Sequence, residues 1–213
     1  MSLEAVNVHP LSGYSFIERE SQPEEDNSVT ARLKRLEDQY AESGIRRSVE
    51  AIMLVNVHDF PHVLVLQVAN AFYKLPGGYL DPVESDSSGL ITRLNEQLGV
   101  PFTPSLIHAG GDWKVGDLLG TWWRPNYDTF YYPYIPAHIS QPKECKKLYL
   151  VELPPNKTFA VPVNMKLHAI PVYEFYDNAA RYGPQFAGIP YILSKYGIYH
   201  QLPAETEAHG GKR

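Results

Sequence analysis

Residues 75–100 read LPGGYLDPVESDSSGLITRLNEQLGV and carry the strongest structural signal in the chain. The segment opens with the glycine pair Gly77-Gly78, and the short polar side chains of residues 86–88 are suited to capping the first turn of a helix. Four apolar residues then recur at helical spacing before Gly99, namely Leu90, Ile91, Leu94 and Leu98. The pattern predicts a glycine-rich loop, an amphipathic helix and a second loop.

A second helix is predicted upstream of this segment. Asn27 or Ser28 offers an N-cap, and Gly44 ends the pattern. Between them the apolar residues Val29, Leu33, Leu36 and Tyr40 recur at helical spacing, and charged residues occupy the opposite side. This arrangement is typical of an amphipathic helix that packs through one face.

Strand patterns surround both helices. From Ser48 the period changes to two, and apolar residues occupy both faces of residues 48–57, which is typical of a strand in a sheet covered on both sides. Further strands are predicted at residues 62–68, 71–74, 118–124, 147–152 and 167–175, and a last helix at residues 190–196, where Pro190 suits a first turn. Helices that alternate with strands in this way indicate an α/β sandwich with a mixed sheet.

The length of 213 residues favours one domain with extensions. Residues 1–27 are predicted to be an irregular N-terminal extension, with a disordered tail as the alternative. The domain is predicted to span residues 28–200 with its flanking helices. Residues 201–213, which contain two adjacent glycines and mixed charges, are predicted to be a mobile tail.

Composition argues against several classes of protein. The formal net charge is −5, from 19 basic and 24 acidic residues, whereas proteins that coat nucleic-acid backbones usually carry a basic surplus. The longest uncharged apolar stretch, residues 51–57, is far below the roughly 18 residues that a membrane helix needs, and the start of the chain lacks a secretory pattern. Cys145 is the single cysteine, so no intrachain disulfide forms. We therefore expect a reducing compartment, no membrane contact, and nucleic-acid binding only through a few bases.

With its full spacing, the segment of residues 75–100 resembles the Nudix box, whose pattern is G-x5-E-x7-R-E-U-x-E-E-x-G-U, with U an aliphatic residue. Six positions are in register, namely Gly78, Glu84, Leu94, Glu96, Gly99 and Val100. The resemblance implies a Nudix-type α/β/α sandwich with a mixed central sheet and N- and C-terminal extensions.

Departures from the Nudix pattern bear on catalysis. Thr92 and Arg93 stand at the R-E positions, and Gln97 replaces the second glutamate of the E-E pair. Nudix hydrolases hold a divalent metal with a face of glutamates, because hard cations bind carboxylate oxygens, and a guanidinium at such a position repels the ion. We therefore expect no catalytic residues, no metal and no cofactor, and ordinary ion pairs for Glu84 and Glu96.

A more specific resemblance covers about residues 7–199. The strings RRSVE (46–50), FYKLPGG (72–78), WWRPN (122–126) and YPYIPAH (132–138) are similar to the small subunit of cleavage factor I, as are KKL (146–148), FAVP (159–162), YDN (176–178) and YGP (182–184). Members of that family bind UGUA elements of RNA upstream of poly(A) sites and do not hydrolyse nucleotides. They form homodimers and pair in the nucleus with a larger subunit that carries an RNA recognition motif. The resemblance implies the same function, partners and nuclear localisation here.

An RNA site is also implied by this resemblance, and single-stranded RNA is commonly read through stacked bases and hydrogen-bonded base edges. Phe72 is implied as the stacking plane with Tyr73 beside it. Arg32 is implied as a donor to a base edge and Glu50 as an acceptor. The remaining implied contacts are Glu24, Leu75, Tyr182 and Gly183. The ordinary alternatives are core aromatics for Phe72 and Tyr73, a solvated helix face for Arg32, a salt bridge for Glu50 and a turn for Tyr182.

Seven aromatic residues crowd residues 122–134. Core and dimer packing is the better explanation for Trp122 and Trp123, whereas the resemblance implies that Tyr132 and Tyr134 border the RNA site. Two other functions stay open. One is a divergent Nudix hydrolase of dinucleoside polyphosphates, and the other is a protein scaffold that does not read RNA directly.

Overall fold

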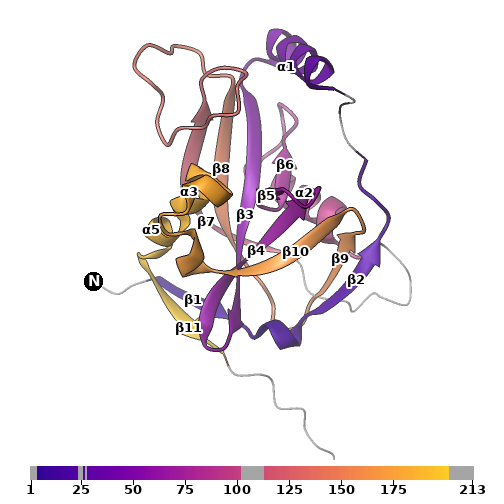
Figure 1. Ribbon diagram of the computed structural model, residues 1–213, viewed down its shortest axis with the longest axis vertical. Coiled ribbons are helices and arrows are strands. Elements are labelled where there is room, and N and C mark those ends of the chain that lie inside the picture. Colours follow the sequence, from indigo (N-terminus) through magenta and orange to yellow (C-terminus); the bar gives the residue numbers. More distant parts are fainter. Residues whose placement is uncertain (1–3, 24–25, 27, 102–112, 202–213) are drawn as a thin grey trace, which may run out of the picture.

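A mixed sheet forms the centre of the computed structural model, which describes residues 4–23, 26, 28–101 and 113–201 (Figure 1). Its main path runs β10–β4–β3–β8–β7, with β5 paired to β4 and β6 paired to β3. Strands β3 and β8 are parallel and the other neighbours are antiparallel, which confirms the prediction of a mixed sheet. The strands are β3 (Arg46–Val57), β4 (Phe60–Val68), β5 (Phe72–Lys74), β6 (Gly77–Tyr79), β7 (Lys114–Arg124), β8 (Glu144–Glu152) and β10 (Met165–Pro171).

Two smaller parallel sheets flank the central one. Strand β1 (Glu4–Val8) pairs with β11 (Tyr196–His200), and β2 (Ser15–Arg19) pairs with β9 (Thr158–Pro162). The prediction of irregular structure for residues 1–27 is therefore wrong where β1, β2 and the intervening 3-10 turn Leu11–Gly13 lie. Each of these strands is completed by a segment far away in sequence, so local sequence gives no sign of the pairing.

Both faces of the central sheet are covered, as the two-sided pattern of residues 48–57 predicts. On one face Ile52 and Leu54 pack beneath the short helices α3 (Ala179–Tyr182), α4 (Pro184–Ala187) and α5 (Ile189–Leu193). On the other face, alternate residues of β3 pack against α2 (Asp86–Leu98), namely Val49, Ala51, Met53 and Val55. Each residue parity of β3 thus belongs to its own apolar core, and the α/β sandwich follows.

The two predicted amphipathic helices are present. Helix α1 (Val29–Ser43) begins at Ser28, whose Oγ accepts from the Ala31 amide at 3.1 Å, and ends at Gly44 with φ +76°. It lies beyond one end of the sheet, at the top of Figure 1. Helix α2 is capped by Ser85 rather than by residues 86–88, because the Ser85 Oγ accepts from the Ser88 amide.

The predictions differ most from the structure near the C-terminal end of the domain. The predicted strand at residues 167–175 ends at Pro171 and continues as the 3-10 turn Val172–Phe175. The predicted helix at residues 190–196 corresponds to α5, which ends at Leu193, and Tyr196 already belongs to β11. The domain limits at residues 28 and 200 stay a prediction. Within the described residues, the helices are all too short or too polar to cross a membrane.

Candidate nucleic-acid interface

Strand β5, at the edge of β4, presents its two aromatic residues differently. The side chain of Phe72 is 72% exposed, whereas Tyr73 is half-buried. The ring of Tyr73 packs on Tyr182 with 4.8 Å between the centroids and meets His168 edge-on at 6.4 Å. Successive side chains of a strand point to opposite sides, so Tyr73 anchors the strand while Phe72 faces solvent. The core alternative considered for both residues applies only to Tyr73.

Tyr182 and Gly183 form the corner next to Tyr73. Tyr182 is 7% exposed, and its Oη donates to Glu174 Oε1 at 2.5 Å. Burial, followed by this hydrogen bond, raises the pKa of Tyr182. Gly183, with φ +95°, joins α3 to α4, and a Cβ at this position would meet no atom within 4 Å. The corner therefore consists of a fixed phenol ring and an uncovered stretch of backbone.

Glu50 is held by two partners inside the protein. Its Oε1 accepts from Lys146 Nζ at 2.6 Å, and its Oε2 accepts from Gln185 Nε2 at 2.5 Å. The side chains of Glu50 and Lys146 are 12% and 13% exposed. Burial alone would lower the pKa of Lys146, but the charge of Glu50 and other nearby groups outweighs burial and raises it. The salt-bridge alternative for Glu50 is therefore present, and its predicted contact with a base stays a prediction.

A buried polar network continues from Lys146 toward the ends of β7 and β8. Lys146 Nζ lies 4.4 Å from the centroid of the Tyr131 ring, and burial raises the pKa of Tyr131 to about 12. The Tyr131 hydroxyl donates to Glu144 Oε1 at 3.1 Å and also contacts Arg124, and Ser48 Oγ donates to Glu144 at 2.7 Å. Sequence reasoning missed the roles of these residues, although KKL at 146–148 was among the strings that carried the resemblance.

Leu75 belongs to the core. Its side chain is 2% exposed and packs in the same apolar cluster as Tyr182. The next residue, Pro76, accepts a hydrogen bond from the Ala51 amide at 2.8 Å through its carbonyl. Leu75 thus fixes the loop to β3, and only its backbone is left for the predicted contact with a base.

The structure does not connect all the predicted residues. Arg32 is exposed on α1, and Tyr132 and Tyr134 contact one another with 5.9 Å between their ring centroids. Tyr132 is also bridged to Trp123 through the backbone. In the described part of the chain, no hydrogen bond or ring contact joins these three side chains to the cluster around Phe72. The structure places Tyr73, Leu75 and Tyr182 in one core, and Glu50 is joined to α4 through Gln185. Phe72 is exposed on the same strand as Tyr73, and Glu24 lies outside the described residues.

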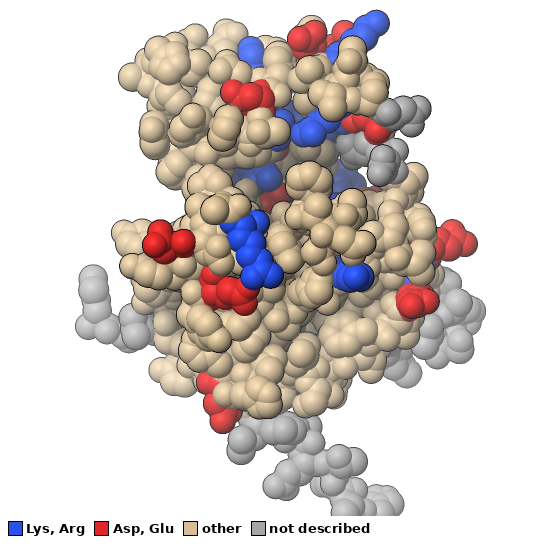
Figure 2. Space-filling model, in the orientation of Figure 1, with Lys and Arg blue, Asp and Glu red and all other residues tan. Residues whose placement is uncertain are grey.

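A cavity of about 800 Å³ lies between α1 and the loop of residues 77–82. Figure 2 shows the surface hollowed between the part that carries α1 and the body, with charged side chains in the hollow. Its lining contains the acids Glu42, Asp81, Glu96 and Glu144, and the basic residues Arg35, Arg46, Arg47, Lys74, Arg93, Arg124 and Lys143. Although the whole chain carries a net charge of −5, this cavity has a basic surplus, which sequence reasoning missed.

Known proteins match nearly all of the chain. A Nudix family profile described as nucleotide hydrolase (NUDIX_2) matches residues 4–196. The Arabidopsis thaliana protein "Pre-mRNA cleavage factor Im 25 kDa subunit 2" is 49% identical over 193 residues, covering 91% of this chain and 94% of that protein. The chain belongs to the Nudix family of cleavage factor Im 25 kDa subunits. The resemblance expected from the sequence is thereby confirmed.

Two further relatives of this cleavage factor Im family show a similar extent of identity. The Dictyostelium discoideum protein "Cleavage and polyadenylation specificity factor subunit 5" is 42% identical, over 92% of this chain and 96% of that protein. The Arabidopsis thaliana "Pre-mRNA cleavage factor Im 25 kDa subunit 1" is 43% identical, over 91% of this chain and 85% of that protein.

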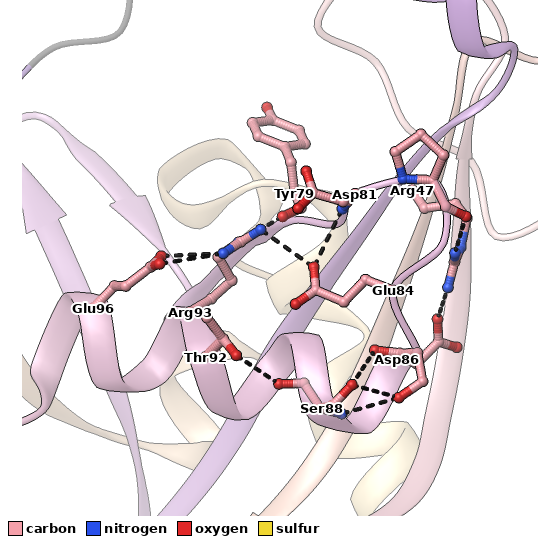
Figure 3. A network of polar contacts seen from close by, with 11 residues as sticks. Arg47, Tyr79, Asp81, Glu84, Asp86, Ser88, Thr92, Arg93 and Glu96 are labelled. Carbon is pink, nitrogen blue, oxygen red and sulfur yellow. Dashed lines mark hydrogen bonds and ion pairs between the residues drawn. The ribbon is translucent and has the colours of Figure 1, made fainter.

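Membership of the Nudix family raises the question of a divalent metal at the box. Arg93 lies between the two retained acids, with its guanidinium 3.3 Å from Glu84 and 3.2 Å from Glu96 (Figure 3). Among the described residues, no group of three or more His, Cys, Asp or Glu side chains is arranged to hold a metal ion. Both remaining carboxylates are paired with the permanent positive charge of Arg93, which repels a divalent cation, so the residues present do not fit one.

Proposed function

We propose that this chain is a non-catalytic subunit of the pre-mRNA cleavage and polyadenylation machinery that binds UGUA elements in single-stranded RNA. The names of the relatives, which describe subunits of cleavage factor Im and of a cleavage and polyadenylation specificity factor, support the role in this machinery. The observation that carries the RNA-binding part is the exposed ring of Phe72 on a strand that Tyr73 anchors through its contact with Tyr182.

Stacking on Phe72 supplies affinity without identity. A base stacked on an aromatic side chain contributes about 1–3 kcal/mol, and every base has a face that stacks. The ring of Phe72 is 72% exposed, and moving apolar surface out of water is favourable in proportion to the area buried. A stacked base would remove this ring from water.

Base identity has to come from polar groups with fixed positions. Glu50 is immobilised by Lys146 and Gln185, and each carboxylate oxygen retains acceptor capacity beyond its one bond. Gly183 lies next to Tyr182 and has open space where a Cβ would stand, and its carbonyl, which accepts from the Ala187 amide at 3.2 Å, retains a second acceptor position. Arg32 on α1 and Glu24 complete the proposed set. These groups suit the imino and amino edges of uracil and guanine.

The absence of catalysis is part of the proposal. Arg93 and Gln97 stand at two positions where the Nudix pattern has glutamates; the guanidinium of Arg93 repels a divalent cation, and the Gln97 Oε1 already accepts from the Gly77 amide. A Nudix fold alone is compatible with an enzyme, so the assignment depends on these two residues and on the relatives.

We further propose a homodimer that pairs in the nucleus with a larger subunit carrying an RNA recognition motif. The relatives are named as subunits, which supports assembly with other proteins. A variant that loses partner binding but keeps its RNA affinity, or the reverse, would separate the two roles. Size-exclusion chromatography with light scattering tests the dimer, with a mass near twice 24.1 kDa as the expected result.

Titration of a short labelled RNA tests the central part of this proposal. We expect saturable binding to an RNA that contains UGUA and at least about tenfold weaker binding when any one base is changed, since each lost base contact costs about 1–3 kcal/mol. Equal affinity for a scrambled RNA contradicts the proposal and leaves the scaffold alternative.

The alternative activity, hydrolysis of dinucleoside polyphosphates, is favoured by one observation, namely the basic surplus of the cavity near α1. Incubation with magnesium and a panel of dinucleoside polyphosphates distinguishes the two. Phosphate release at an enzyme-like rate supports the hydrolase, whereas intact nucleotides support binding without catalysis.

A further inference from the structure

The two residues that replace acids in the Nudix box both bind the backbone of the loop beside them. The Arg93 Nε donates to the Tyr79 carbonyl at 2.6 Å (Figure 3). Gln97 is 3% exposed, and its Oε1 accepts from the Gly77 amide at 3.0 Å. Arg93 and Gln97 are therefore hydrogen-bonded to the backbone of the short strand β6 at its two ends.

Arg93 also neutralises the acids that remain. Its Nη2 lies 3.3 Å from Glu84 Oε2, and its Nη1 lies 3.2 Å from Glu96 Oε2. The same oxygen of Glu84 accepts from the Asp81 amide at 3.2 Å. In Figure 3 the guanidinium occupies the space between the two carboxylates, with the Tyr79 carbonyl on its third side.

The stem of Arg93 fits the loop as closely as its charged end. A Cβ added to Gly78 would lie 3.3 Å from Arg93 Cδ, so the glycine permits the arginine to lie across the loop. Gly77 has φ +145°, and a Cβ there would overlap the backbone of Val49. The loop is thus fitted to β3 on one side and to Arg93 on the other.

A guanidinium can perform the structural task of a divalent cation at this position. It carries a permanent charge and a rigid fork of donors, which bonds two carboxylates and a carbonyl at once. A magnesium ion would need near-octahedral oxygen ligation and would be repelled by the arginine. We propose that Arg93 is a built-in cation that holds the Nudix loop, together with Gln97, so that the loop needs no metal and admits none.

This inference does not depend on RNA binding, because it concerns only the loop and the helix. It has two consequences: divalent cations leave the protein unchanged, and replacing Arg93 by an acid creates a metal site. The variant Arg93→Glu supplies a third carboxylate beside Glu84 and Glu96, in a box from which the repelling charge has been removed.

Calorimetric titration with Mn²⁺ alone tests the second consequence. We expect no saturable binding by the unaltered protein, binding at least about tenfold tighter by Arg93→Glu, and loss of that gain in Arg93→Glu/Glu84→Gln. The inference is overturned if the unaltered protein binds Mn²⁺ in a manner that Glu84→Gln abolishes. It is also overturned if folded Arg93→Glu binds no more tightly than the unaltered protein.

Hydrogen exchange decides the matter independently, including the case in which Arg93→Glu does not fold. In Arg93→Gln, the amides of residues 77–80 are expected to exchange at least about tenfold faster, because charge-assisted hydrogen bonds to the loop are lost. The matched control is Arg181→Gln, which removes the α3 arginine paired with Glu174 at 3.0 Å and should change these amides less than about twofold. Equal exchange in both variants would overturn the inference.

Discussion

The charged groups of the Nudix box face one another, whereas the aromatic edge of the neighbouring sheet faces solvent. The side chains of Arg93 and Glu84 are 21% and 19% exposed, and Arg93 donates hydrogen bonds to Glu84 and to the Tyr79 carbonyl within the box. Phe72, a few residues before the same loop, is 72% exposed. The acids that a Nudix hydrolase would offer to a metal are paired with Arg93 here, whereas the exposed group on the neighbouring strand is an apolar ring.

The difference indicates which chemistry the scaffold can perform. Internally paired charges stabilise a loop, but they leave no open ligands for a cation that could polarise a phosphate. An exposed aromatic ring can stack a base, and an immobilised carboxylate can accept from a base edge, without any reaction. Both regions belong to the same fold, and they differ in whether their side chains are paired with one another or exposed to solvent.

Removing Lys146, the cation that holds Glu50, should have the largest effect on stability. Lys146→Met leaves Glu50 with a buried charge and without its cation, so the free energy of unfolding should fall by about 3–5 kcal/mol in urea denaturation. The double variant Lys146→Met/Glu50→Leu should recover most of this loss. The control is Lys114→Met, which removes an exposed partner of Glu152 and should cost less than about 1 kcal/mol. Equal losses for the two lysine variants would show that the pair of Glu50 and Lys146 is not a buried support.

Removing the open ring itself should affect binding and spare the fold. Phe72→Ala should weaken RNA affinity by about 1–3 kcal/mol, measured by fluorescence anisotropy, because one stacking plane is lost. Its free energy of unfolding should change by less than about 0.5 kcal/mol, as for other exposed sites. Tyr191→Ala is the matched control, since Tyr191 is 83% exposed on α5. Unchanged RNA affinity in Phe72→Ala would remove this ring from the site.

The ion pairs of Asp86, at the start of α2, should make the stability of the protein sensitive to acid. Burial would raise the pKa of Asp86, but hydrogen bonds from Lys147, Arg47 and Tyr149 outweigh burial and lower it to about 2. The stabilisation is therefore complete above the ordinary pKa near 3.8 and is lost as pH falls toward 2.

Asp86→Asn should remove about 1–2 kcal/mol of this pH-dependent stability between pH 5 and pH 2. Urea denaturation at several pH values measures it, with Asp38→Asn on the exposed side of α1 as the control. An unaltered pH profile in Asp86→Asn would mean that these ion pairs do not stabilise the fold.

The salt dependence of RNA binding should be shallow, because the proposed site contacts bases rather than many phosphates. The slope of log affinity against log salt concentration should be shallower than about −3, which corresponds to about four phosphate contacts on a single strand. Binding measured from 50 to 500 mM salt checks this. A slope steeper than about −5 would shift the main contacts to phosphates and to the basic cavity.

Sequence reasoning predicted the parts that depend on local pattern. Ser28 and Gly44 mark α1 correctly, and alternation along residues 48–57 predicted the two cores. Strands β1 and β11 were missed, because Val6 and Val8 make too short a pattern and the pairing joins residue 4 to residue 196.

For the site, the family resemblance named candidate residues such as Glu50, but not the side chains that hold them in place. Glu50 and Lys146 lie on different strands, and only the register of β3 against β8 brings them together. The burial of Leu75 likewise follows from packing against distant segments, which a linear pattern does not reveal.

The most direct test of a base-reading Nudix protein is RNA affinity measured with all divalent cations removed. In excess EDTA, the account predicts that a UGUA-containing RNA binds with the same dissociation constant as in magnesium, within about twofold. It also predicts at least about tenfold weaker binding of the same RNA with its guanine replaced. Loss of binding in EDTA, or equal binding of the two RNAs, would contradict the claim that this Nudix-fold protein reads bases without metal.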